Sequence, residues 1–179
     1  MKKIFILCIF FIPIVLQAQQ PTKKISIYVL GGNKSSSYLK EAAHKQIVSK
    51  TEAKHHKCIV FNAGIQFDIS EKWRIGASFT YDHFGTKHRS IEYSNISYLL
   101  RCDRVWKNGK NYALYSGLAT GFRKVREFEN EVEIKRKVSL GYQIYVAGLN
   151  YKLANRFFID ANAGWGVSGI LSVGGKYFF

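Results

Sequence analysis

The sequence predicts an all-β protein, an eight-stranded antiparallel up-and-down β-barrel that crosses a membrane. Three observations lead to this prediction. Apolar and polar residues alternate over long stretches, the connections between those stretches differ in length, and the chain finishes on the apolar segment "GGKYFF". Alternation with a period of two is typical of strands with two unlike faces, and strands joined alternately by short turns and long loops are typical of membrane barrels.

The first 18 residues predict a secretory signal peptide. Lys2 and Lys3 precede an apolar run over 4–16, and Ala18 lies at the expected cleavage point. The run is shorter than the ~20 residues that a membrane-spanning helix needs. Cleavage removes both lysines and lowers the net charge from +15 to +13. It leaves one domain, 19–179, which we expect to form the barrel.

Alternation defines the strands in the rest of the chain. Between 58 and 69 the odd positions read Ile, Phe, Ala, Ile, Phe, Ile and the even positions read Cys, Val, Asn, Gly, Gln, Asp. The segment from Trp73 to His83 alternates in the same way, so the two form a hairpin. The predicted strands are 23–33, 56–69, 73–84, 90–106, 111–126, 137–153, 156–166 and 169–179.

The connections separate the two ends of the predicted barrel. Short turns fall at 70–72, 107–110 and 154–155, and longer connections fall at 34–55, 85–89 and 127–136. The last outer connection, 167–168, is short. The strands are long enough for the ~9–11 residues with which a tilted strand crosses the apolar layer.

The sixth strand does not keep one register. Its apolar residues occupy even positions over 140–144 and odd positions over 149–153. A β-bulge at 145–147 would reconcile the two halves, and so would a different boundary of the strand.

A soluble lipocalin-like barrel would turn its apolar face inward, whereas a membrane barrel turns it outward. Two features favour the membrane arrangement. Glycine occupies much of the polar face, as a narrow interior requires, and aromatic residues lie beside the short turns, where they form an interfacial girdle. The girdle residues are Trp73, Trp106, Tyr112, Tyr151 and Tyr177.

The end of the chain has the same alternation. Phe179, Tyr177, Val173 and Leu171 share the outward face, with Gly175 as the exception. This ending resembles the C-terminal signature of outer-membrane β-barrel proteins, and the layout resembles their small OmpA/OmpX-type barrels. The resemblance implies recognition by the barrel-assembly machinery and, after signal-peptide cleavage, a place in the outer membrane of a Gram-negative bacterium. We expect a monomer in contact with outer-membrane lipid and lipopolysaccharide.

The interior of an eight-stranded barrel is only wide enough to be filled by side chains. Four carboxylates and four cations fall on the predicted inner face: Asp68, Asp82, Asp103, Asp160, Arg74, Arg101, Arg123 and Lys176. Unpaired buried charges are costly, so these groups predict a paired network that plugs the lumen. A gated path through the same groups, making a narrow channel for ions or small solutes, is the alternative.

The loops predict a structural or surface-interaction role. The stretch 34–57 holds six Lys, three His and two Glu, and a cationic rim attracts the phosphates of lipopolysaccharide. A surface partner would meet the same loops. A signal peptide directs the chain away from nucleic acid, so a nucleic-acid partner is not expected.

We expect no enzymatic activity, no cofactor and no metal site. His88, Ser90 and Glu92 weakly resemble the His-x-Ser element of outer-membrane lipid A deacylases, which keeps a lipid A-modifying enzyme as a second alternative. The histidines show no ligand spacing. Cys58 and Cys102 fall toward opposite ends of the barrel, so free thiols are expected.

Overall fold

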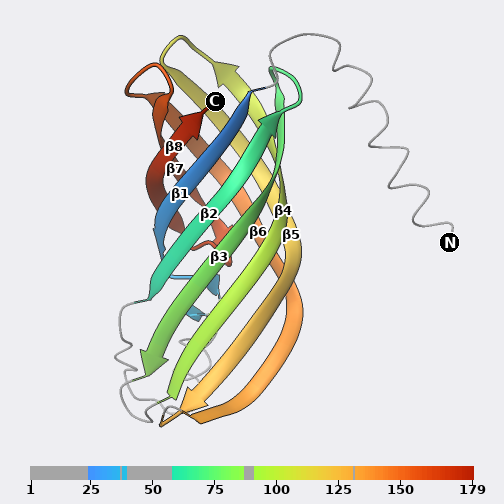
Figure 1. Ribbon diagram of the computed structural model, residues 1–179, viewed down its shortest axis with the longest axis vertical. Coiled ribbons are helices and arrows are strands. Elements are labelled where there is room, and N and C mark those ends of the chain that lie inside the picture. Colours follow the sequence, from blue (N-terminus) through green and yellow to red (C-terminus); the bar gives the residue numbers. More distant parts are fainter. Residues whose placement is uncertain (1–23, 37, 40–57, 87–90, 131) are drawn as a thin grey trace, which may run out of the picture.

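Eight antiparallel strands pair in chain order and close into a barrel (Figure 1). The computed structural model describes residues 24–36, 38–39, 58–86, 91–130 and 132–179. The strands are β1 (Ile25–Asn33), β2 (Ile59–Asp68), β3 (Trp73–Thr86), β4 (Ile91–Asn108), β5 (Tyr112–Glu129), β6 (Val132–Lys152), β7 (Phe157–Gly166) and β8 (Leu171–Phe178). The β1–β8 ladder, from Ser26 opposite Phe178 to Asn33 opposite Leu171, closes the seam. The predicted fold class is confirmed, while the signal peptide lies outside the described residues.

The wall of the barrel is apolar outside and polar inside. Along β2, Ile59 is 63% exposed while Gln66 is fully buried. Along β3, Ala77 is exposed and Ser78 is buried. An apolar outer belt around a polar interior is stable against lipid and not against water, so the strands are transmembrane strands. Across the described segments, no helix combines the length and apolar character needed to span a bilayer.

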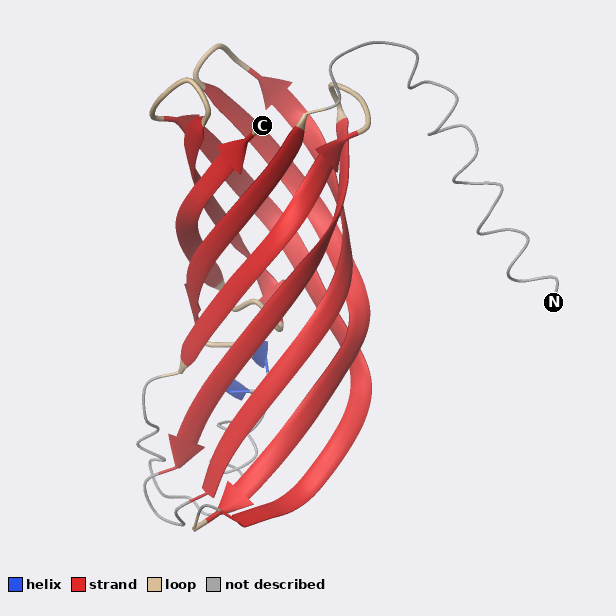
Figure 2. Cartoon of the chain, in the orientation of Figure 1, coloured by secondary structure: helices blue, strands red, loops and turns tan. Residues whose placement is uncertain are grey.

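The two ends of the barrel differ. The turns β2–β3, β4–β5 and β6–β7 lie at the end that also holds the start of β1 and the end of β8, at the top of Figure 1. We name it the short-turn end, and in membrane barrels this end faces the periplasm. In such barrels the opposite, long-loop end faces outward. Residues 36 and 38–39 are helical and lie at that end (Figure 2), where Ser36 is buried.

The predicted bulge in β6 is present. The pairing of β6 with β7 shifts between Tyr145 and Ala147, and the ladder with β5 shifts at the same level, between Tyr115 and Gly117. The extra residue lets both halves of β6 turn their apolar side chains toward lipid.

Strand β6 is longer than its alternation predicts. It begins at Val132 instead of residue 137, and β5 continues to Glu129. The charged segment 127–136 was expected as a loop, yet it extends the β5–β6 ladder, with Glu127 opposite Lys135. Cross-strand pairs of opposite charge stabilise such a ladder in water. The β5–β6 hairpin therefore projects further than β7 and β8, which have 10 and 8 residues.

Candidate functional site

The middle of the barrel is filled by a chain of charged and amide side chains from opposite walls. Arg101 on β4 donates from Nε to both carboxylate oxygens of Asp103, at 2.9 Å each. Gln66 on β2 donates from Nε2 to Asp103 Oδ2 at 2.6 Å, and Lys176 on β8 donates from Nζ to Gln66 Oε1. All four residues are at most 2% exposed. The charge of Arg101 is therefore compensated by Asp103, while Lys176 bonds to an uncharged amide, in a space from which water is largely excluded.

Three tyrosine rings surround the Arg101 guanidinium. Its central carbon lies 4.0 Å from the ring centre of Tyr145, 5.3 Å from that of Tyr28 and 5.4 Å from that of Tyr115. A cation over an aromatic face is stabilised by the ring quadrupole, most strongly when both are desolvated. The Tyr115 hydroxyl in turn donates to Asp160 Oδ1 at 2.5 Å. Strands β1, β4, β5, β6 and β7 are thus linked across the lumen.

Gly148 makes room for this ring cluster. A Cβ at residue 148 would lie 2.1 Å from Cζ of Tyr115. Glycine on the inner face is therefore required here by the tyrosine that crosses the lumen.

The short-turn end of the interior contains a second cluster. Arg74 on β3 donates from Nη1 to Asn150 Oδ1 at 2.7 Å and forms an ion pair with Asp68, 3.1 Å from Nε to Oδ1. Asn150 is 1% exposed, whereas the Asp68 side chain is 22% exposed.

The β7–β8 connection, 167–170, folds into the barrel instead of pointing away from it. Ser168 is 2% exposed, and its backbone N–H donates to Gln143 Oε1 at 2.8 Å. Its carbonyl accepts from Ser172 Oγ at 2.8 Å and from Asn62 Nδ2 at 3.3 Å. Gly169, at φ +93°, adopts a left-handed conformation that suits glycine and lets the turn invert.

The start of the first long loop also turns inward. Ser35 is buried and donates from Oγ to Asp82 Oδ2 at 2.5 Å. The same hydroxyl accepts from the backbone N–H of Tyr38 at 3.3 Å, in the manner of a helix N-cap. The ring of Tyr38 then packs edge-on against Phe84, with centroids 5.7 Å apart. The loop is thereby tied to the inside of β3.

All eight residues of the predicted lumen network lie on the inner face, six of them buried and Asp68 and Arg123 half-buried. Only two of the expected charge pairs form among them, Arg101 with Asp103 and Arg74 with Asp68. Asp82, Asp160 and Lys176 bond to neutral partners instead. Within the described ranges Arg123 forms no ion pair.

The sequence did not predict several interior contributors, among them Ser35, Gln143, Asn150 and Ser168. Gln143 and Asn150 had a usable signal, because each lies on the inward face of one half of β6. The two serines had none, since they lie in connections without alternation.

The residues of the predicted assembly signal face away from the lumen. Leu171, Val173 and Phe179 are 53%, 57% and 64% exposed, and Tyr177 is half-buried beside Phe179. Recognition by the assembly machinery stays a prediction.

The structure describes only part of the motif that resembles the lipid A deacylases. His88 and Ser90 lie outside the described residues, and Glu92 is exposed, 3.9 Å from Nε2 of His83. Across the segments that the structure describes, no group of three His, Cys, Asp or Glu side chains is arranged to hold a metal ion. Cys58 and Cys102 are unpaired.

The comparison with solved structures agrees with this architecture. The N-terminal β-barrel domain of Pseudomonas aeruginosa OprF matches 89% of this chain and 100% of its own, with a TM-score of 0.58 and 13% identity. Neisserial surface protein A matches 87% of this chain and 90% of its own, with a TM-score of 0.51 and 10% identity. The chain has the fold of the eight-stranded outer-membrane β-barrels. No protein-family model and no curated protein sequence matches it.

Proposed function

We propose that this protein is a non-enzymatic outer-membrane barrel that acts by surface contact, binding lipopolysaccharide phosphates at its long-loop end. It resides as a monomer in the outer membrane of a Gram-negative bacterium, after signal-peptide cleavage and insertion by the barrel-assembly machinery. Its lumen is plugged and serves as a rigid support.

One observation carries the lipopolysaccharide proposal, an outer basic cluster made of Lys124, Arg126 and Arg136. Arg126 lies directly opposite Arg136 in the β5–β6 ladder, and Lys124 is close enough for both of these charges, and for the opposite charge of Glu133, to act on it. Like charges placed opposite each other destabilise a ladder. Within the described part of the chain, none of the three forms an ion pair. A phosphate bound between them would remove this repulsion.

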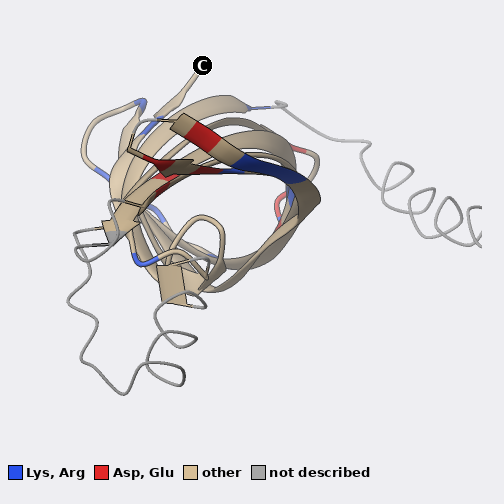
Figure 3. Cartoon of the chain, turned by 90° about the horizontal axis from the view of Figure 1, so that it is seen from below, with Lys and Arg blue, Asp and Glu red and all other residues tan. Residues whose placement is uncertain are grey.

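The position of the outer basic cluster fits the headgroup layer. The three residues share one face of the β5–β6 hairpin, on the same side as Phe122, which is 74% exposed on the apolar belt. Figure 3 views the barrel from the long-loop end, where acidic and basic positions gather on one side of the rim. Arginine binds phosphate bidentately, so two arginines facing one site favour phosphate groups over zwitterionic headgroups.

The first long loop, 34–55, was the expected contact site because it is the longest and most cationic. Most of it lies outside the described residues. Its described part, 34–36 and 38–39, turns into the barrel mouth. The proposal therefore rests on the β5–β6 hairpin.

The plug argues against the narrow-channel alternative. Arg101, Asp103 and Lys176 cross the lumen and are at most 2% exposed, with the β7–β8 connection packed beyond them. The test is single-channel recording in planar bilayers. If the lumen is plugged, we expect no conductance steps. Steady unitary currents would support the narrow channel instead.

The surface proposal is tested by binding to vesicles that contain lipopolysaccharide, across a salt series. We expect Arg126→Gln with Arg136→Gln to weaken binding about tenfold at low salt, and the difference to shrink as salt screens the charges over a Debye length of ~8–10 Å. The matched control is Lys72→Gln with Lys107→Gln, which removes the same charge at the short-turn end. Equal binding by the wild-type protein, the double variant and the control variant would refute lipopolysaccharide binding by the outer basic cluster.

A further inference from the structure

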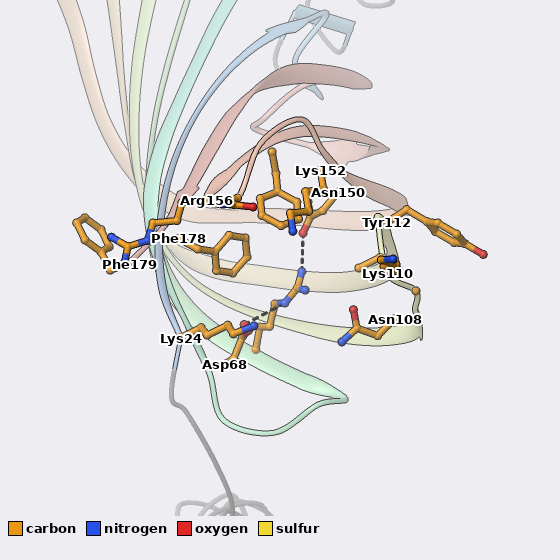
Figure 4. Close-up of a pocket in the computed structure, with 15 residues that line it drawn as sticks. Lys24, Asp68, Asn108, Lys110, Tyr112, Asn150, Lys152, Arg156, Phe178 and Phe179 are labelled. Carbon is orange, nitrogen blue, oxygen red and sulfur yellow. Dashed lines mark hydrogen bonds and ion pairs between the residues drawn. The ribbon is translucent and has the colours of Figure 1, made fainter.

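The short-turn end of the barrel contains an open cavity of about 470 Å³. Figure 4 shows its lining side chains, which include labelled lysine, arginine and aromatic residues. Residues beside the start of β1, at the end of β8 and from all three short-turn hairpins contribute to the lining. We name this cavity the inner vestibule.

Positive charge dominates the inner vestibule. Among the described residues, five cationic side chains line it: Lys24, Arg74, Lys110, Lys152 and Arg156. Of the same described lining residues, Asp68 alone has an acidic side chain, and it is already engaged by Arg74. The other four cations form no ion pair within the part of the chain that the structure describes. The described lining therefore has an excess of positive charge.

The floor of the vestibule presents an unused hydrogen-bond donor. Asn150 is 1% exposed, and its Oδ1 is occupied by Arg74. Its Nδ2 is buried with no hydrogen-bond partner, and the residue lines the cavity. A buried donor that is left without an acceptor destabilises the protein. A negatively charged oxygen on the cavity side would satisfy it and would also approach the guanidinium of Arg74.

The walls strengthen such an interaction. Phe158 and Phe178 line the cavity from β7 and β8, and Tyr112 lines it from β5. Apolar walls lower the local dielectric constant, so a charge pair between them is worth more than the same pair on an open surface. They also offer area for the apolar part of an organic ligand.

The vestibule is blind. Beyond Arg74 and Asn150 the lumen is occupied by Lys176, Gln66 and Asp103, which are bonded to one another and buried. A ligand would therefore enter and leave by the short-turn end, on the periplasmic side.

We infer that the inner vestibule is a binding site for a small periplasmic oxyanion, a molecule bearing phosphate or carboxylate groups. Arg74 and Asn150 form its floor, and Lys152 and Arg156 supply charge at its rim. This site is separate from the outer basic cluster, at the opposite end of the barrel, and does not depend on it.

The test uses the full mature barrel in a neutral maltoside detergent, which carries no phosphate. Inorganic phosphate is titrated and followed by ³¹P NMR, citrate is titrated by calorimetry, and glucose serves as the neutral probe. We expect saturable 1:1 binding of at least one anion and none of glucose. Phosphate and citrate distinguish the two oxyanion chemistries.

The variants locate the site. Lys152→Gln with Arg156→Gln changes a half-buried and an exposed side chain at the rim, neither of which forms an ion pair within the described residues. This double variant should weaken anion binding about tenfold, which corresponds to about 1.4 kcal/mol. The matched control, Lys135→Gln with Lys137→Gln, removes the same charge from the β5–β6 hairpin and should leave binding unchanged. The inference is overturned if neither anion binds saturably, or if both double variants reduce binding equally.

Discussion

Replacing Asp103 by asparagine tests whether the lumen is held together by its buried charge pair. The substitution keeps the shape of the side chain and removes its charge. Arg101 would then remain charged at 2% exposure, without the carboxylate that accepts from its Nε at 2.9 Å. Asp103 also accepts from Gln66 at 2.6 Å, so a second charge-assisted hydrogen bond becomes a neutral one.

The expected cost follows from this geometry. Removing one partner of a buried ion pair leaves an uncompensated charge and typically costs ~3–5 kcal/mol. The three tyrosine rings around Arg101 stabilise the cation only in part. We therefore expect Asp103→Asn to lower the free energy of unfolding by about 3 kcal/mol. Asp68→Asn is the matched control, because its side chain is 22% exposed and its ion pair should contribute only about 1 kcal/mol.

The assay is urea-induced unfolding of the barrel in phospholipid vesicles, followed by tryptophan fluorescence and by heat-modifiable gel mobility. A third variant, Arg101→Leu with Asp103→Leu, removes both charges and should recover most of the lost stability. Equal costs for Asp103→Asn and Asp68→Asn would refute the reasoning. So would a double variant that is less stable than Asp103→Asn.

Three further predictions concern the wall and the packing of the barrel. Phe179→Lys should prevent membrane assembly, and the heat-modifiable folded band should be missing from outer-membrane fractions. Ala77→Arg should lower the free energy of unfolding by ~2–4 kcal/mol because it places a charge in lipid. In a background without Cys58 and Cys102, lipid-phase quenchers should reach a fluorescent label at residue 77 and not one at residue 78. Equal quenching at the two positions would show that the register is wrong. Gly148→Leu should lower the free energy of unfolding by about 1–3 kcal/mol, because the new side chain overpacks against Tyr115. A variant as stable as the parent would contradict the close approach of the Tyr115 ring to the backbone at residue 148.

The alternation of residue types determined most of the fold. In a strand, successive side chains point to opposite faces, so the sequence of β2 already states which residues meet lipid and which meet the interior. The same rule located the bulge in β6, because an extra residue reverses the parity of everything that follows it. The start of β6 was misjudged because three of the five residues over 132–136 are charged, which is typical of a loop. Val132 and Ile134 nevertheless alternate with Glu133 and Lys135 and share the outward face of β6, so a short signal for the strand was present.

Only the tertiary structure decided which interior residues meet. Arg74 bonds to Asn150 and Tyr115 bonds to Asp160, across 76 and 45 positions of sequence. Such contacts depend on the tilt and stagger with which the strands close, and alternation carries no information about either. The inward folding of Ser35 and Ser168 could not be predicted either, because the segments that connect strands have no alternation of apolar and polar residues. The sequence thus determined the two faces of the wall, and closure of the barrel determined how the interior is filled and where the inner vestibule lies.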